Sequence, residues 1–204
     1  IDHEEGWVVT LPGITNSEPG NGFIDAREDR PAFFNFPNGI DLFSMTFSCP
    51  VVDAATLGDL HEGSFVASNT AGDSLSVLGV SFSEPGVGPY FVTLSTPILP
   101  GEWTTIAALV ESQEGIPVGF DPLDRIDIGF LPGDANGDGM SAPDDVLAII
   151  PTLSGVASRP LPMTSTDMDR SDTLTALDVI RLIDLLNGAN SSQAWLGHFL
   201  PARP

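Results

Sequence analysis

The chain has 204 residues, with 28 acidic and only 7 basic side chains, and a formal net charge of -21. This charge argues against binding to nucleic acid, whose phosphates are neutralised by Lys and Arg, and against adhesion to an anionic membrane through a basic patch. An apolar fraction of 42% with 12 Phe and 3 Trp is enough for a core, so we expect a globular chain with a well-solvated exterior.

Residues 1–131 have the pattern of a β-rich domain. Short apolar stretches are separated by Gly, Pro, Asn and Ser, and apolar and polar residues alternate over 43–47, which is typical of a half-buried strand. These features predict an antiparallel β-sandwich. The predicted strands are 6–11, 23–26, 40–47, 64–68, 75–82, 90–94, 104–110 and 125–130.

The order of segments within residues 40–110 resembles bacterial Ig-like domains of S-layer and other surface proteins. The segments that carry the resemblance are MTFS at 45–48, VVDAATL at 51–57, SF at 64–65, YFVTL at 90–94 and LPGEWT at 99–104. The resemblance implies an Ig-like sandwich that serves as a spacer or adhesion module, and it brings no catalytic residues.

A very short linker joins this domain to the rest of the chain. Only residues 131–133 separate the last predicted strand from the acidic segment that follows. We therefore expect two domains, 1–131 and 132–204, that pack together as one unit with the apolar Leu131 at the junction.

The pattern after residue 133 is helical. Apolar residues recur at i, i+3, i+4 and i+7 in two segments, which predicts two amphipathic helices. Pro143 suits the first turn of the first helix, whereas Pro151 predicts that this helix bends or ends near Ile150. The periodic residues are Val146, Ile149, Ile150 and Leu153, then Val179, Leu182, Ile183 and Leu186.

The two helical segments are copies of one repeat with a shift of 33 residues. The shift carries Val146 onto Val179 and Leu153 onto Leu186, and it also carries an acidic segment onto a second one. One such helix cannot bury its own apolar face, so we expect the two copies to face each other.

The first acidic segment, 134–145, matches the D-x-N-x-D-G pattern of a calcium loop. Ca²⁺ takes six to eight oxygen ligands, and residues at alternating positions converge on it as the loop curls. Gly139 at the sixth position permits the sharp turn. The expected ligands are Asp134, Asn136, Asp138, the backbone carbonyl of Met140, and Asp145.

The second acidic segment, 167–178, predicts a second calcium site. Asp172 replaces glycine at the sixth position, and Asp tolerates the left-handed backbone better than most residues. A neutral serine stands where the first loop has Asp138, which predicts the weaker site. The expected ligands are Asp167, Asp169, Ser171, the backbone carbonyl of Thr173, Thr175 directly or through water, and Asp178.

Charge is concentrated in these two loops. Eight of the nine acidic residues of 132–204 lie within them, and all nine are Asp. Such carboxylates repel one another without a cation, so we expect this part of the chain to fold or tighten when metal binds.

Two calcium loops, each followed by a helix, with no helix leading into the first loop, resemble type I dockerin modules over residues 133–188. The resemblance implies docking onto a cohesin domain that attaches the chain to an extracellular scaffold. It also implies calcium ligands at loop positions 1, 3, 5 and 12, which are Asp134, Asn136, Asp138 and Asp145 in the first loop and Asp167, Asp169, Ser171 and Asp178 in the second. Dockerins often have Ser-Thr at loop positions 10 and 11, where this chain has Pro143-Asp144 and Ala176-Leu177.

No catalytic motif is evident. The three histidines are far apart in sequence, and no phosphate loop or nucleophile elbow is present, so we expect a non-catalytic protein. Core packing is favoured over a sugar-stacking platform for Trp7, Trp103 and Trp195. We also expect Trp195, Phe199 and Leu200 to pack the C-terminal segment against the helices or the sandwich.

These observations favour a secreted or cell-surface protein that attaches to a cohesin-like partner or a surface scaffold. One alternative is the carbohydrate-binding accessory region of a polysaccharide-degrading enzyme. Another is the calcium-rigidified C-terminal region of a larger exported protein. Because the chain begins at Ile1 without a signal peptide, we expect it to be a mature or trimmed form. No apolar run is long enough to insert into a membrane.

Overall fold

The structure is a computed structural model that describes residues 13–28, 40–83, 88–117, 125–189 and 193–204. The predicted strand at 6–11 and Trp7 lie outside the described residues. No helix in the described ranges is long and apolar enough to cross a membrane.

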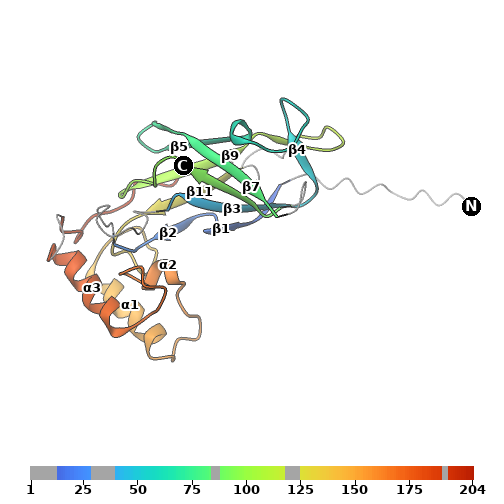
Figure 1. Ribbon diagram of the computed structural model, residues 1–204. Coiled ribbons are helices and arrows are strands. Elements are labelled where there is room, and N and C mark those ends of the chain that lie inside the picture. Colours follow the sequence, from blue (N-terminus) through green and yellow to red (C-terminus); the bar gives the residue numbers. More distant parts are fainter. Residues whose placement is uncertain (1–12, 29–39, 84–87, 118–124, 190–192) are drawn as a thin grey trace, which may run out of the picture.

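In the described chain, short strands make up the first part and the α-helices follow in the last part (Figure 1). The strands are β1 (Ile14–Glu18), β2 (Phe23–Asp25), β3 (Leu42–Phe47), β4 (Val51–Asp53), β5 (Phe65–Asn69), β6 (Ser74–Leu75), β7 (Val77–Phe82), β8 (Tyr90–Leu94), β9 (Glu102–Ala108), β10 (Val110–Ser112) and β11 (Arg125–Phe130). The helices are the 3-10 turn η2 (Glu62–Ser64), α1 (Pro143–Leu153), α2 (Met163–Thr166) and α3 (Ala176–Asn187).

The strands form a β-sandwich, as the sequence predicts. One sheet has the order β1-β3-β8-β7 and the other β2-β11-β9-β5-β6, while β10 and β4 form a separate ribbon. Inward-facing side chains from both sheets make one apolar cluster, because residues of each strand alternate between the core and the exterior. Phe43 and Met45 of β3 meet Ile106 of β9 and Ile126 of β11 in this cluster, and all four are fully buried.

Two features of the sandwich differ from the prediction. β2 runs parallel to β11, so the sandwich is not purely antiparallel. A run of three residues does not encode the direction of its partner, so this pairing was not readable from the sequence. β1, β4 and most of β10 were not predicted as strands, since β1 (ITNSE) has one apolar residue in five and the other two have only three residues each.

Helix α1 begins at Pro143, as predicted, but continues through Pro151 to Leu153. The helix therefore does not end at Ile150, and the alternative expectation, a bend there, stays a prediction. A proline near the end of a helix removes a single backbone hydrogen bond. The helix closes beyond the proline, where both the backbone N–H and the Oγ of Ser154 donate to the Ile150 carbonyl.

A second apolar cluster joins the sandwich to the helices. Ile24, Trp103 and Leu131 come from the sandwich side, and they pack with Ile149 of α1 and Leu182 of α3. Leu131 is fully buried there, which confirms its predicted place at the junction. Helices α1 and α3 therefore face each other and also close one end of the sandwich (Figure 1).

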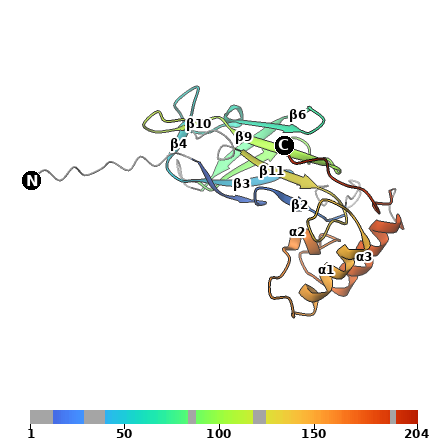
Figure 2. The same cartoon turned by 180° about the vertical axis from the view of Figure 1, so that it is seen from behind.

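The C-terminal segment, residues 193–204, runs from the helices back to the sandwich. Figures 1 and 2 both show the chain leaving α3 and ending beside the strands of the five-stranded sheet. Trp195 and Leu200 are buried in the second cluster, as expected. The same expectation for Phe199 was wrong, because its side chain is 70% exposed. Phe199 forms a β-bridge with Met140 instead, which directs its side chain outward.

Candidate metal centres

The first acidic loop curls around the carboxylate of Asp134. Its Oδ1 accepts from the backbone N–H groups of Gly137 at 2.9 Å and Asp138 at 3.1 Å. Its Oδ2 accepts from the N–H of Gly139 at 2.8 Å. Asp145, in the first turn of α1, accepts from residues 136 and 142 at 2.9 and 2.8 Å. The loop therefore wraps its first and last acids with backbone donors, and both acids are fully buried.

The other expected ligands of the first loop lie on its outer side. Asn136 Oδ1 accepts from the Asp138 N–H at 2.8 Å, and Asn136 Nδ2 donates to Asp138 Oδ2 at 3.1 Å. The N–H of Met140 donates to Asp138 Oδ1 at 2.9 Å. These contacts place Asn136 and Asp138 together at the exposed rim of the loop.

The second loop brings three carboxylates together. Oxygen atoms of Asp167, Asp169 and Asp178 all lie within 4.8 Å of one another. Of these, Asp167 and Asp178 are fully buried or nearly so, while Asp169 is half-buried. This spacing suits a hard cation that binds several oxygens at about 2.3–2.6 Å. Among the described residues, no other three acidic, His or Cys side chains lie this close together, so the carboxylates converge more in the second loop than in the first.

The neutral ligands predicted for the second loop also lie beside these acids. Ser171 Oγ is 3.3 Å from Asp167 Oδ1 and 3.1 Å from the Thr173 hydroxyl oxygen. Thr175 donates to Asp178 Oδ2 from its backbone N–H at 2.7 Å and from its hydroxyl at 3.2 Å. The structure thus groups the side chains of all the predicted residues of this loop around Asp167 and Asp178.

The same hydrogen-bond scheme recurs in the two loops at the shift of 33 residues. The Gly139 N–H donates to Asp134, and the Asp172 N–H donates to Asp167 at 2.8 Å. In both loops, the backbone N–H groups of the third and ninth residues donate to the carboxylate of the twelfth residue. The internal repeat is therefore one of local structure as well as of sequence.

The backbone also repeats. Gly139 has φ 87°, and Asp172 at the matching position has φ 60°, which confirms the left-handed conformation expected there. Gly137 has φ 75°, and its counterpart Arg170 has φ 56°. A non-glycine residue is uncommon in this region, so the second loop forms the same turn at greater conformational cost.

Burial makes these carboxylates harder to ionise. Burial raises the pKa of Asp134 to about 6, with a further contribution from the negative charges of Asp145 and Asp138. Burial likewise raises the pKa of Asp145 to about 6. In the second loop, burial and the neighbouring Asp169 and Asp178 raise the pKa of Asp167. A bound cation has the opposite effect, because an opposite charge favours the ionised form.

The residues present fit a calcium ion. Both loops offer carboxylate, amide, hydroxyl and backbone oxygens, which are the ligands that hard cations prefer. Each loop also surrounds its first and twelfth acids with backbone N–H groups that set the orientation of the carboxylates.

Sequence reasoning missed how the second loop contacts the sandwich. The Arg170 guanidinium lies 3.3 Å from Asp25 Oδ2 and 5.9 Å from the ring centre of Phe130. Its Nε donates to the backbone carbonyl of Glu28 at 3.1 Å. The only available signal was an arginine at the fourth position of an otherwise acidic loop.

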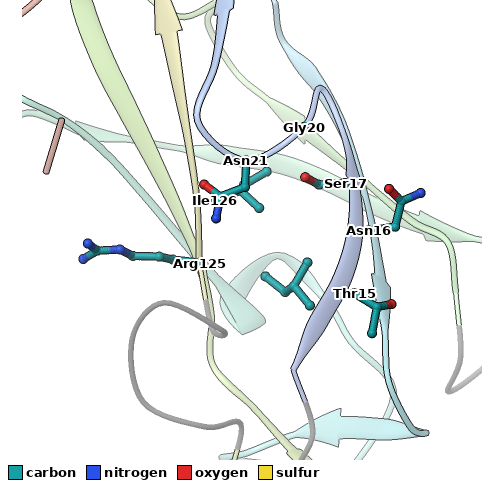
Figure 3. Close-up of a pocket in the computed structure, with 8 residues that line it drawn as sticks. Thr15, Asn16, Ser17, Gly20, Asn21, Arg125 and Ile126 are labelled. Atoms are coloured by element: carbon teal, nitrogen blue, oxygen red, sulfur yellow. The ribbon is translucent and has the colours of Figure 1, made fainter.

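The tryptophans in the described ranges do not form a sugar-stacking platform. Trp103 and Trp195 are both 6% exposed and belong to the second cluster. A pocket of about 160 Å³ lies elsewhere, between β1 and β11, lined mainly by small polar side chains (Figure 3). Figure 3 shows the Arg125 side chain extending away from the other labelled residues. This pocket shares no lining residue with either acidic loop.

Comparisons with known proteins find matches among solved structures. No family model matches the chain, and no curated protein matches it. Solved structures that match include the crystal structure of an S-layer protein, rSbsC(31-844), and domains 1–6 of SbsC, each at 15% identity and TM-score 0.38 over 60% of this chain. The N-terminal part of the bacterial S-layer protein SbsC matches with the same values. The chain spans only 14% to 24% of the lengths of those proteins. At this TM-score the likeness does not establish a shared function.

Proposed function

We propose that this chain is a non-catalytic module of the bacterial cell surface or extracellular space, which binds two calcium ions and attaches to a partner protein through α1 and α3. The observation that carries the proposal is the repeated loop and helix, with the same hydrogen bonds to the first and twelfth acids in both copies.

Calcium is the first part of the proposal. Asp134, Asn136, Asp138, the Met140 carbonyl and Asp145 are the candidate ligands of one ion. Asp167, Asp169, Ser171, the Thr173 carbonyl, Thr175 and Asp178 are those of the other. A bound ion supplies the positive charge that opposes repulsion among these acids, and the chain's own backbone N–H groups orient the carboxylates toward it.

Attachment is the second part. Two apolar residues on each helix remain exposed at matching repeat positions, Leu147 and Ile150 on α1 and Ile180 and Ile183 on α3. Leu147 is 67% exposed and Ile180 is 55% exposed. Apolar residues three positions apart lie on one face of a helix, and exposed apolar faces are characteristic of protein–protein contacts. The dockerin resemblance makes a cohesin-like domain the first partner to test.

The calcium test is a titration of the full chain with calcium, measured by isothermal titration calorimetry. We expect two ions per chain, and one ion after Asp145→Asn. The neighbouring substitution Asp144→Asn is the matched control, because Asp144 is exposed, lies in the same loop and is not an expected ligand. Absence of calcium binding to the full chain would contradict the proposal.

The attachment test is a calcium-dependent pull-down against a panel of cohesin domains, with a glycan array in parallel. Binding that is lost on Leu147→Ser and retained on Leu78→Ser supports docking through α1, since both leucines are 67% exposed but Leu78 lies on the sandwich. Binding to glycans alone points to a carbohydrate-binding accessory region. Calcium binding without either partner points to a calcium-rigidified structural region.

A further inference from the structure

We infer that the C-terminal segment, residues 193–204, is a positioning element for the first calcium loop, so that calcium binding there and docking of this segment on the sandwich stabilise each other. The inference rests on the calcium binding proposed above. It assigns a role to a segment that lies beyond both repeats and contains no calcium ligand.

The C-terminal segment pairs with the backbone on both sides of Met140, whose carbonyl is an expected ligand. The Leu200 N–H donates to the Gly139 carbonyl at 2.9 Å, and the Ser141 N–H donates to the His198 carbonyl at 2.9 Å. Met140 itself forms an antiparallel β-bridge with Phe199. These contacts fix the orientation of the peptide groups around the seventh position of the loop.

The other end of the segment is bound to the sandwich. The indole Nε1 of Trp103 donates to the Pro201 carbonyl at 2.9 Å. The Arg203 Nε lies 3.0 Å from Asp127 Oδ2, and its guanidinium lies 6.0 Å from the Trp103 ring centre. Leu200 is buried between these two sets of contacts. The segment therefore connects the loop directly to strands β9 and β11.

The second loop lacks this arrangement within the described part of the chain. No strand-like pairing outside the loop is found for Thr173, which occupies the position of Met140. Loosening the C-terminal segment should thus weaken calcium binding at the first loop and leave the second loop unchanged. Thermodynamic linkage requires the converse, that calcium at the first loop tightens the segment.

The test compares Leu200→Ala with Leu196→Ala in the full chain. Both leucines lie in the C-terminal segment, but Leu200 is 8% exposed and Leu196 is 52% exposed. Calcium is titrated while the backbone amide NMR signals of Gly137 and Ser171 report the first and second loops separately. We expect Leu200→Ala to weaken binding at the first loop about fivefold or more, with the second loop unchanged. Leu196→Ala should leave both loops unchanged.

Two further measurements do not depend on Leu200→Ala folding correctly. Trp103→Phe removes the donor to Pro201 and should weaken the first loop in the same direction by a smaller factor. In the unsubstituted chain, calcium should slow hydrogen exchange at the Leu200 amide. Three outcomes would overturn this inference while leaving the proposed function intact. They are equal calcium affinities of the first loop in the two leucine variants, equal weakening of calcium binding at both loops, and an exchange rate at the Leu200 amide that calcium does not change. A chain without calcium binding would overturn the proposed function as well.

Discussion

Arg170 and Asp25 form an ion pair of 3.3 Å between the second acidic loop and the edge of the sandwich, although they are 145 residues apart in sequence. Both side chains are buried, at 8% and 0% exposure. Asp25 also pairs with Arg27 at 2.9 Å. The junction between the two parts of the chain is therefore electrostatic as well as apolar.

Arg170→Gln should destabilise the chain by about 1–3 kcal/mol, because it leaves the buried Asp25 with Arg27 as its remaining charged partner among the described residues. Chemical denaturation followed by tryptophan fluorescence measures the change in the free energy of unfolding. Arg159→Gln is the control, since Arg159 is exposed and its substitution changes the net charge by the same amount. Equal stabilities of the two variants would show that the ion pair contributes nothing to the junction.

Removal of calcium should lower the melting temperature of the full chain. A ligand present at about 100 times its dissociation constant stabilises the folded state by about 2.7 kcal/mol per site, and a chelator removes that contribution. Differential scanning calorimetry with excess calcium and with EGTA measures the shift. Asp178→Asn should reduce the shift, because the substitution removes a carboxylate of the second loop. Identical melting curves with and without chelator would contradict calcium-linked stability.

Gly139→Ala should destabilise the first loop by about 1–2 kcal/mol for conformational reasons alone. Gly139 has φ 87°, where a side chain is strained, yet an added Cβ would meet no atom within 4 Å. Gly20→Ala is the matched control, because its surroundings are equally open and its φ is not in the left-handed region. The free energies of unfolding of both variants give the comparison. A similar loss at both positions would argue against backbone strain as the cause.

Asp53 should make the sandwich sensitive to acid. The Ser64 hydroxyl, which donates to Asp53 Oδ2 at 2.7 Å, and the donors of Thr56 and Ala55 lower the pKa of Asp53 to about 2. The folded-state pKa lies below the ordinary aspartate value of 3.8, so this stabilisation is present above about pH 4 and is lost as the pH falls toward 2.

Asp53→Asn should therefore destabilise the chain by about 1–3 kcal/mol at neutral pH, and this difference should shrink between pH 4 and pH 2. Urea denaturation at a series of pH values measures it. Asp59→Asn, at an exposed position in the same region, should show little difference at any pH. A difference for Asp53→Asn that stays constant across this range would rule out the titration of Asp53 as its source.

Much of each candidate site was readable from the sequence because its contacts are local. The twelfth-position acids Asp145 and Asp178 accept hydrogen bonds from backbone groups only three and nine residues away. In the second loop, spacing alone therefore predicted that Asp167, Asp169 and Asp178 lie together. The left-handed backbone of Asp172 followed from the same reasoning, since the loop has to turn at its sixth position.

Contacts that depend on how distant segments meet were not readable in this way. The parallel pairing of β2 with β11 has no periodic signal, because β2 has only three residues. The exposure of Phe199 and the burial of Leu200, its neighbour, depend on the β-bridge to Met140. No local pattern distinguishes these two apolar side chains.

The sequence by itself determined a β-rich first part, two loop–helix repeats and the carboxylates that each loop brings together, because hydrophobic period and ligand spacing act within about a dozen residues. The tertiary structure alone decided that Arg170 reaches Asp25 and that the C-terminal segment joins the first loop to Trp103. Those contacts span 145 and 98 residues, and they form only when surfaces from distant parts of the chain bury their apolar side chains against each other.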